Sequence, residues 1–283
     1  MPVRLPYRLL LPLLGAATNS YSLSGMINSD LSYNNLPVYA AGQPLEMSGI
    51  GKGVRVSTRF LSNWSAGVGV SRLKATDDHN TDNAEYEYQD KSAFVGYQWH
   101  DHWFELSGGL VTDHLDAPLA SQANMRVNSQ TDGERLAFTW GYDWYFGNWS
   151  PEISSSIRLN HITFQEDQHT PGAREFQRLN EDHSSTTLQQ AASLGYMASW
   201  GEQILVSTIG LDYQHSLTGK IEYTGYNNDP ASSEQSSGDV QQSSVFVALS
   251  WLTDPWSINT SLSRALMNCP CEQQIRITGG YSF

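Results

Sequence analysis

The chain ends in a stretch that alternates between apolar and polar side chains. The odd positions of this stretch are Ile275, Ile277, Gly279, Tyr281 and Phe283, and the even positions are Gln274, Arg276, Thr278, Gly280 and Ser282. A period of two places the two sets on opposite faces of a β-strand. In a membrane barrel the apolar face of such a strand meets lipid and the polar face lines a watery lumen.

The same alternation recurs through the chain, for example at residues 104–111, 136–144, 188–200 and 244–251. These stretches exceed the roughly 5–6 residues of a common globular strand and match the ~9–11 residues that cross a bilayer at a tilt. We expect an all-β fold, a 12-stranded antiparallel transmembrane β-barrel of the outer-membrane type. The expected strands are 20–33, 51–61, 64–76, 86–100, 102–115, 132–146, 149–166, 184–200, 203–226, 239–252, 255–268 and 273–283.

Composition agrees with a barrel and excludes other classes. Hydrophobic residues make up 39% of the 283 residues, and the mean hydropathy of −0.42 excludes a helical membrane protein. Half of each barrel strand is polar, so a barrel has this profile. The formal charge of −13, with only 16 Lys and Arg, argues against a nucleic-acid partner, which requires a basic face.

The two cysteines, Cys269 and Cys271, lie in an Asn-Cys-Pro-Cys-Glu segment without further ligands nearby. This spacing fits neither a zinc site nor a thioredoxin-like motif, which leaves a local disulfide or free thiols. We expect no metal and no cofactor. His100-Asp101-His102 also lacks the additional ligands of a metal site and is expected to be a tight turn.

Connections between the expected strands alternate in length. Residues 34–50, 77–85, 116–133, 166–183 and 227–238 form longer or more polar links, whereas 62–63, 101, 147–148, 201–202 and 254 form tight turns. Outer-membrane barrels have short periplasmic turns and longer external loops. We therefore expect a protein of the outer membrane of a Gram-negative bacterium, with both termini in the periplasm.

Tryptophan placement supports this orientation. Most of the nine tryptophans flank the tight turns, and indole rings gather at membrane interfaces with their N–H groups toward water. The predicted aromatic girdle consists of Trp64, Trp99, Trp103, Trp144, Trp149, Trp200, Trp251 and Trp256.

Charged and polar residues on the polar faces indicate what lines the lumen. The expected lumen-facing set is Glu105, Arg135, Asp143, Glu152, Arg158, Asn160, Gln274 and Arg276. Charges of both signs inside a barrel can pair and hold the strand register, or they can contact a segment that passes through the lumen. Both interpretations remain open at this point.

Several segments between Ser48 and Phe283 carry a family resemblance. They are 48–54, 64–70, 94–99, 103, 108–109, 141–143, 146–151, 157–160 and the final Phe283, spread over about 235 residues. In order and spacing they resemble the translocator β-domain of autotransporters, the type V secretion barrels, and look closest to barrels that carry GDSL-type esterase passengers.

This resemblance implies a barrel that the assembly machinery folds into the outer membrane and that supports export of an N-terminal passenger. It also implies that the final strand is the assembly signal, with Ile277, Tyr281 and Phe283 as its apolar positions. The expected partners are outer-membrane lipid and lipopolysaccharide, the barrel-assembly machinery and the protein's own passenger. We expect a monomer.

No passenger precedes the barrel in this sequence, because about nineteen residues come before the first expected strand. Residues 1–19 resemble a weak signal peptide, with Arg4 and Arg8 before an apolar run, or the remnant of a pore-threading linker helix. We expect either the barrel part of a longer protein or a relative without a passenger. Residues 20–283 form the expected barrel domain.

Two alternative functions remain. A stand-alone barrel could be a small-solute channel, and twelve strands also suit an outer-membrane phospholipase. A lipase needs a nucleophile, a base and a polar group that orients the base, and the sequence offers only His183 and Ser185 in a His-Ser-Ser segment. The Gly-x-Ser-x-Gly and Gly-Asp-Ser-Leu motifs are absent. We therefore expect no enzymatic activity.

Overall fold

The structure of the protein is a computed structural model. The structure describes residues 24–40, 43–77, 84–118, 125–169, 176–224, 234–236, 241–266 and 273–283. Residues 1–19, Cys269 and Cys271 lie outside the described residues, so the predictions made for them stay predictions. Within the described ranges, no helix has the length and apolar character needed to cross a membrane.

Twelve long strands are found in the described residues. They are β1 (Ser24–Ala40), β2 (Gln43–Phe60), β3 (Trp64–Thr76), β4 (Glu85–Trp99), β5 (His102–Pro118), β6 (Arg126–Asp143), β7 (Trp149–His169), β8 (Phe176–Trp200), β9 (Gln203–Thr224), β11 (Gln241–Thr253), β12 (Trp256–Ala265) and β13 (Gln273–Ser282). A three-residue strand, β10 (Glu234–Ser236), pairs with the outer part of β9 only.

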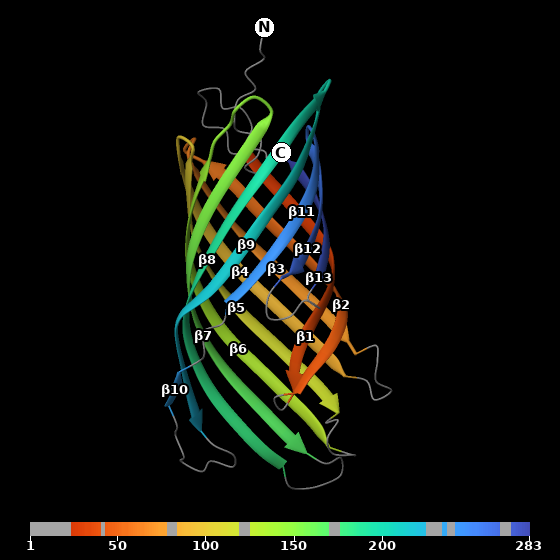
Figure 1. The fold of residues 1–283 in the computed structure, drawn as a ribbon, viewed down its shortest axis with the longest axis vertical. Coiled ribbons are helices and arrows are strands. Elements are labelled where there is room, and N and C mark those ends of the chain that lie inside the picture. The colour runs from red at the N-terminus through yellow and green to blue at the C-terminus, as the bar shows by residue number, and fades with distance from the viewer. Residues whose placement is uncertain are drawn as a thin grey trace.

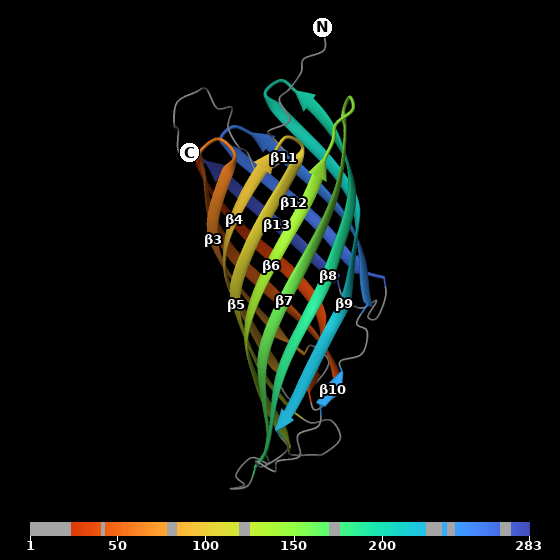
Figure 2. The same cartoon turned by 90° about the vertical axis from the view of Figure 1, so that its left-hand side faces the viewer.

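The sheet closes on itself as an antiparallel barrel of strongly tilted strands (Figures 1 and 2). Each long strand pairs with its neighbours in chain order, and β13 returns to β1 with a register that runs from Met26↔Ser282 to Asn35↔Gln273. Closure leaves no unpaired edge within the ring. The predicted 12-stranded antiparallel barrel is confirmed.

Alternation along each strand separates an outward apolar face from an inward polar face. Outward side chains such as Val68, Leu110 and Ile209 are 53–60% exposed. Apolar residues also face one another across neighbouring strands, as in Val56↔Val68 and Ile209↔Val247. This continuous apolar outer surface is the face that a bilayer would cover.

The two ends of the barrel differ. Tight turns at residues 61–63, 100–101, 144–148, 201–202 and 254–255 gather at one end, here called the short-turn end. Gly147 and Gly201 have φ of 62° and 63°, a region that glycine enters without steric cost. Phe283 lies at this end too, where it exchanges backbone hydrogen bonds of 2.8 and 3.0 Å with Gly25.

At the opposite end, here called the loop end, strands extend into segments that were predicted to be loops. Residues 34–50 were expected as a loop, yet β1 continues to Ala40 and β2 begins at Gln43. Likewise β5 and β6 cover most of 116–133, and β7 and β8 most of 166–183. The outward positions of these segments are largely polar, so the apolar outer face that marks the other strands is missing there, while backbone pairing continues.

Part of the lumen at the loop end is apolar. Met47, Leu115 and Val127 are buried to 0–1% exposure and pack with Ala75, Ala84 and Ala117. Val38, Leu45 and Tyr86 pack against them. Met47, Leu115 and Val127 each lie an even number of residues from inward-facing Arg55, Glu105 and Asp143 on β2, β5 and β6, and so share their inward phase. We call these nine residues the inner apolar cluster.

Candidate functional site

A cavity of about 300 Å³ lies in the lumen at the short-turn end. Residues of the nine strands from β1 to β9 line it, so it brings together most of the ring. Its charged lining consists of Arg55, Arg59, Glu105, Asp143 and Glu152. The cavity is therefore polar and amphoteric, with basic residues on β2 and acidic residues on β5 to β7.

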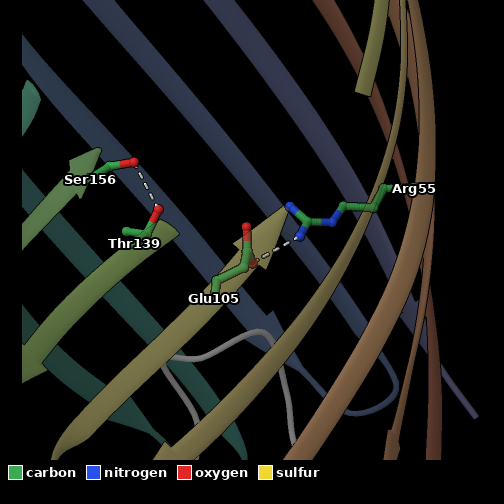
Figure 3. Close-up of polar contacts among 4 residues, drawn as sticks. All are labelled: Arg55, Glu105, Thr139 and Ser156. Carbon is green, nitrogen blue, oxygen red and sulfur yellow. Dashed lines mark hydrogen bonds and ion pairs between the residues drawn. The ribbon is translucent and has the colours of Figure 1, made fainter. Parts of the chain in front are cut away.

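Arg55 and Glu105 bridge strands that are not neighbours. Arg55 Nη2 lies 3.4 Å from Glu105 Oε2, so an ion pair spans from β2 to β5 inside the barrel (Figure 3). The Arg55 guanidinium also lies 3.9 Å from the centre of the Phe94 ring of β4, at a distance typical of cation–π contacts. On neighbouring β6 and β7, the Thr139 hydroxyl donates to Ser156 Oγ at 3.0 Å (Figure 3).

The opposite wall is acidic. Asp143 of β6 and Glu152 of β7 are register partners, and the Trp103 indole donates a hydrogen bond to Asp143. In the adjacent turn, burial and the nearby carboxylates of Asp143 and Glu152 raise the pKa of the Tyr145 phenol above its usual range. Burial is the main cause of this rise, and the neighbouring carboxylates add to it.

Trp103, which was predicted to belong to the aromatic girdle, faces the lumen. It lines the cavity, and its ring fills the space over Gly141, where an added Cβ would meet it at 2.2 Å. Trp103 lies two residues before Glu105 and so shares its inward phase. The prediction used its closeness to a turn and ignored that phase.

The other predicted girdle residues lie on outward positions beside the short turns. Trp64 packs against Tyr97, Trp149 against Tyr196 and Trp256 against Tyr281 in tilted or edge-to-face pairs, with 4.8–4.9 Å between ring centres. Trp99 and Trp200 are 54% and 86% exposed. Trp144 contacts Tyr142, and Trp251 donates to Gln203 Oε1 at 3.3 Å.

Between this cavity and the loop end, charged groups on different strands pair across the lumen. Arg135 of β6 forms an ion pair with Asp90 of β4, a buried carboxylate that also accepts a hydrogen bond from Tyr88 at 3.3 Å. Arg158 donates to Gln189 Oε1 at 3.3 Å, and Gln189 donates to Asp212 at 2.8 Å. These contacts tie β4 to β6 and β7 to β9.

The remaining predicted lumen residues also lie on the inward phase. Asn160 donates to Ser185 Oγ at 3.2 Å, and Gln274 donates to Asn34 Oδ1 at 2.6 Å. Arg276 pairs in register with Ser32 and Ser261 on the same face and is exposed.

Sequence reasoning missed Arg55, Asp90 and Asp212. Arg55 was detectable, because Gly51, Gly53 and Arg55 alternate with apolar Val54 and Val56. Asp90 shares its strand face with Tyr86 and Tyr88. Because that face is both aromatic and polar, the sequence did not show whether it points inward or outward. The inner apolar cluster was missed because part of it was assigned to a loop.

The barrel resembles two solved structures. The translocator domain of the autotransporter NalP from Neisseria meningitidis matches with a TM-score of 0.61 and 12% identity, over 94% of this chain and 89% of that one. The β-domain of the Bordetella autotransporter BrkA matches with a TM-score of 0.64 and 12% identity, over 93% and 100%. The barrel shares the fold of autotransporter translocator domains.

At 12% identity these similarities establish the fold. No protein-family model matches the chain. No curated protein matches its sequence. The predicted resemblance to translocator barrels is confirmed at the level of architecture.

The residues considered for lipase chemistry separate in space. His183 contacts Glu181 at 2.7 Å, whereas Ser185 accepts a hydrogen bond from Asn160, and both lie on the inward face. On the outward face, Ser184 Oγ and Asp182 Oδ1 lie 3.2 and 3.4 Å from the same nitrogen, His161 Nδ1. A relay needs the nucleophile and the orienting group on different ring nitrogens, so this arrangement lacks triad geometry.

Among the described residues, no cluster of three or more His, Cys, Asp or Glu side chains could hold a metal ion. The final strand places Ile277 and Tyr281 on the outward face, and Phe283 is 65% exposed. An added Cβ at Gly25 would meet the Phe283 ring at 2.4 Å, so glycine there makes room for the terminal aromatic.

Proposed function

We propose that this chain is the translocator barrel of an autotransporter, located in the outer membrane of a Gram-negative bacterium. The short-turn end faces the periplasm, as do the N- and C-terminal residues of the barrel domain. The loop end faces the outside of the cell. The lumen guides an N-terminal passenger segment across the membrane. The barrel acts as a monomer and contacts outer-membrane lipid, lipopolysaccharide and the barrel-assembly machinery.

The amphoteric cavity at the short-turn end carries this proposal. An extended polypeptide entering from the periplasm exposes backbone donors and acceptors as well as side chains of both charges. Arg55, Glu105 and Asp143 offer partners for each of these groups at one point along the lumen. The fold that the barrel shares with translocator domains also supports a translocator function.

The test is surface display. An epitope placed ahead of Met1, behind a secretion signal, is expected to become accessible to antibody on intact cells. Glu105→Arg leaves two cations facing each other, so we expect several-fold slower display, whereas the outward Leu106→Ala variant displays normally. An epitope that stays periplasmic while the barrel is folded and heat-modifiable in the outer membrane contradicts the proposal.

Removal of Phe283 tests the assembly partner. We expect the truncated chain to lose most of its heat-modifiable, membrane-inserted form, because the terminal residue closes the β1–β13 seam through two backbone hydrogen bonds to Gly25. Phe283→Ala keeps those bonds and isolates the aromatic contribution. Normal insertion of both variants would show that Phe283 is not part of the assembly signal.

A small-solute channel is the second candidate. A second lumen cavity of about 440 Å³ lies nearer the loop end, beside Asn34, Tyr86 and Gln242. The inner apolar cluster occupies part of that end, so we expect low conductance in planar bilayers and a rise when Met47 and Leu115 are both replaced by Ser. High steady conductance of the unaltered barrel would favour the channel.

The proposal includes no catalytic activity. If Ser184, His161 and Asp182 worked as a lipase, phospholipid turnover by the purified barrel would fall with Ser184→Ala. We expect the same background rate for both proteins.

A further inference from the structure

Outward-facing cations gather on three adjacent strands. Lys52 of β2, Arg72 and Lys74 of β3, and Lys91 of β4 are all exposed, and the registers Lys52↔Arg72 and Val70↔Lys91 place them on one face. We call these four residues the basic patch. The chain has only 16 Lys and Arg and a formal charge of −13, so this concentration is unusual within it.

The basic patch lies at the upper border of the apolar band. Arg72 and Lys91 each lie eight residues along their strands from an outward tryptophan at the short-turn end, Trp64 and Trp99. Eight residues span about 26 Å along a strand, or about 20 Å along the membrane normal at a tilt of about 40°. The band in such barrels is about 25 Å tall, which puts the patch near the outer headgroups.

Half of the basic patch already has a partner. Arg72 and Lys74 both contact Glu87, the latter at 3.3 Å. Lys52 and Lys91 form no ion pair with any residue that the structure describes. Glu85 lies beyond Lys74, and Glu134 lies two strands from Lys91. Positive charge therefore remains on the patch at a place where anionic headgroups are available.

A groove continues from Lys91 toward the middle of the band. It measures about 480 Å³, and its outward side chains are Val68, Ala93 and Leu110, with Lys91 and Glu134 at its border. Gly108 forms part of its floor, where an added Cβ would meet only ordinary contacts of 3.6 and 3.9 Å. Small residues thus leave an open apolar trough below a cation.

Cations above an apolar trough match one ligand chemistry, an anionic lipid. We propose that the outward face of β2–β4 binds a phosphorylated glycolipid of the outer leaflet. Its phosphates contact Lys52 and Lys91, and one acyl chain occupies the groove at Ala93 and Gly108. This inference rests on the proposed outer-membrane location, and it adds the binding residues and the headgroup chemistry.

The opposite side of the barrel provides a contrast. At a comparable outward position, β7 and β8 carry His161, Asp182 and Ser184, which satisfy one another. Arg264 of β12 is outward and exposed but stands apart from the patch, next to Val245 and Gln273 in register. Arg264→Gln is therefore a matched control for the removal of an outward cation.

The experiment measures binding of purified lipopolysaccharide to the full-length barrel refolded in detergent. Lys52→Gln/Lys91→Gln is expected to weaken binding at least tenfold, and Arg264→Gln to leave it unchanged. Dephosphorylated lipopolysaccharide is expected to bind the unaltered barrel as weakly as the intact lipid binds the double variant. Gly108→Phe, which fills the groove, is expected to weaken binding while the phosphate contacts remain.

Equal binding by the double variant and the unaltered barrel overturns the inference, as does equal binding of phosphorylated and dephosphorylated lipid. Heat-modifiable migration confirms that each variant is folded. Epitope display on cells reports separately on the translocator proposal. If the epitope is displayed but lipid binding does not depend on phosphate, the lipid-site inference fails and the translocator proposal stands. If the barrel is absent from the outer membrane, both fail.

Discussion

The two ends of the lumen are built from the same strands yet have opposite chemistry. At the short-turn end, β2, β5 and β6 turn Arg55, Glu105 and Asp143 toward a polar cavity. At the loop end the same strands, in the same phase, bury Met47, Leu115 and Val127. A barrel strand can therefore change the role of its inward face along its length, from lining water to forming a core.

This difference has an energetic consequence. Burial of a large apolar side chain contributes about 1.5–3 kcal/mol, whereas exposed ion pairs contribute roughly 0–1 kcal/mol. The loop end is thus expected to stabilise the barrel more per residue than the short-turn end. The charged cavity is better suited to contact with a passing chain than to holding the fold.

The largest expected effect is at the loop end. Leu115→Ala removes a side chain with 1% exposure from the inner apolar cluster and is expected to lower the free energy of unfolding by about 2–5 kcal/mol. Urea titration of the refolded barrel measures it. The outward Leu106→Ala variant is the control, since detergent or lipid still covers that site, and equal losses in both would mean that the cluster is not a core.

A smaller effect is expected at the short-turn end. Gly141→Ala would place a Cβ 2.2 Å from the Trp103 ring, and displacement of that ring is expected to cost about 1–3 kcal/mol. Gly108→Ala, in the open outward groove, should cost far less. Tryptophan fluorescence should shift for Gly141→Ala alone. An unshifted spectrum would contradict the inward position of Trp103.

The smallest effect belongs to the ion pair across the cavity. Arg55 and Glu105 side chains are 48% and 29% exposed, so a double-mutant cycle with Arg55→Gln and Glu105→Gln is expected to give a coupling of about 0.2–1 kcal/mol. Added salt should reduce it. A coupling above the Leu115→Ala loss would reverse the proposed ranking of the two ends.

Sequence alternation predicted the architecture well because the side-chain period of a strand is two. Once a stretch such as 136–144 is recognised, the phase assigns Leu136 outward and Arg135 inward without any tertiary information. The even number of strands and the gathering of the tight turns at one end of the barrel followed from the spacing of these stretches. Trp103 was predicted wrongly, although the phase of Glu105 already pointed it inward.

Other features depend on closure of the sheet. The pairs Arg55–Glu105 and Asp90–Arg135 join strands that are not neighbours, and no local pattern specifies which charges meet across a lumen. The strand extensions at 34–48 lack an apolar outward face, so only backbone pairing with a neighbour identifies them. The inner apolar cluster likewise forms because curvature brings β2, β5 and β6 together, a contact between residues that are distant in the chain.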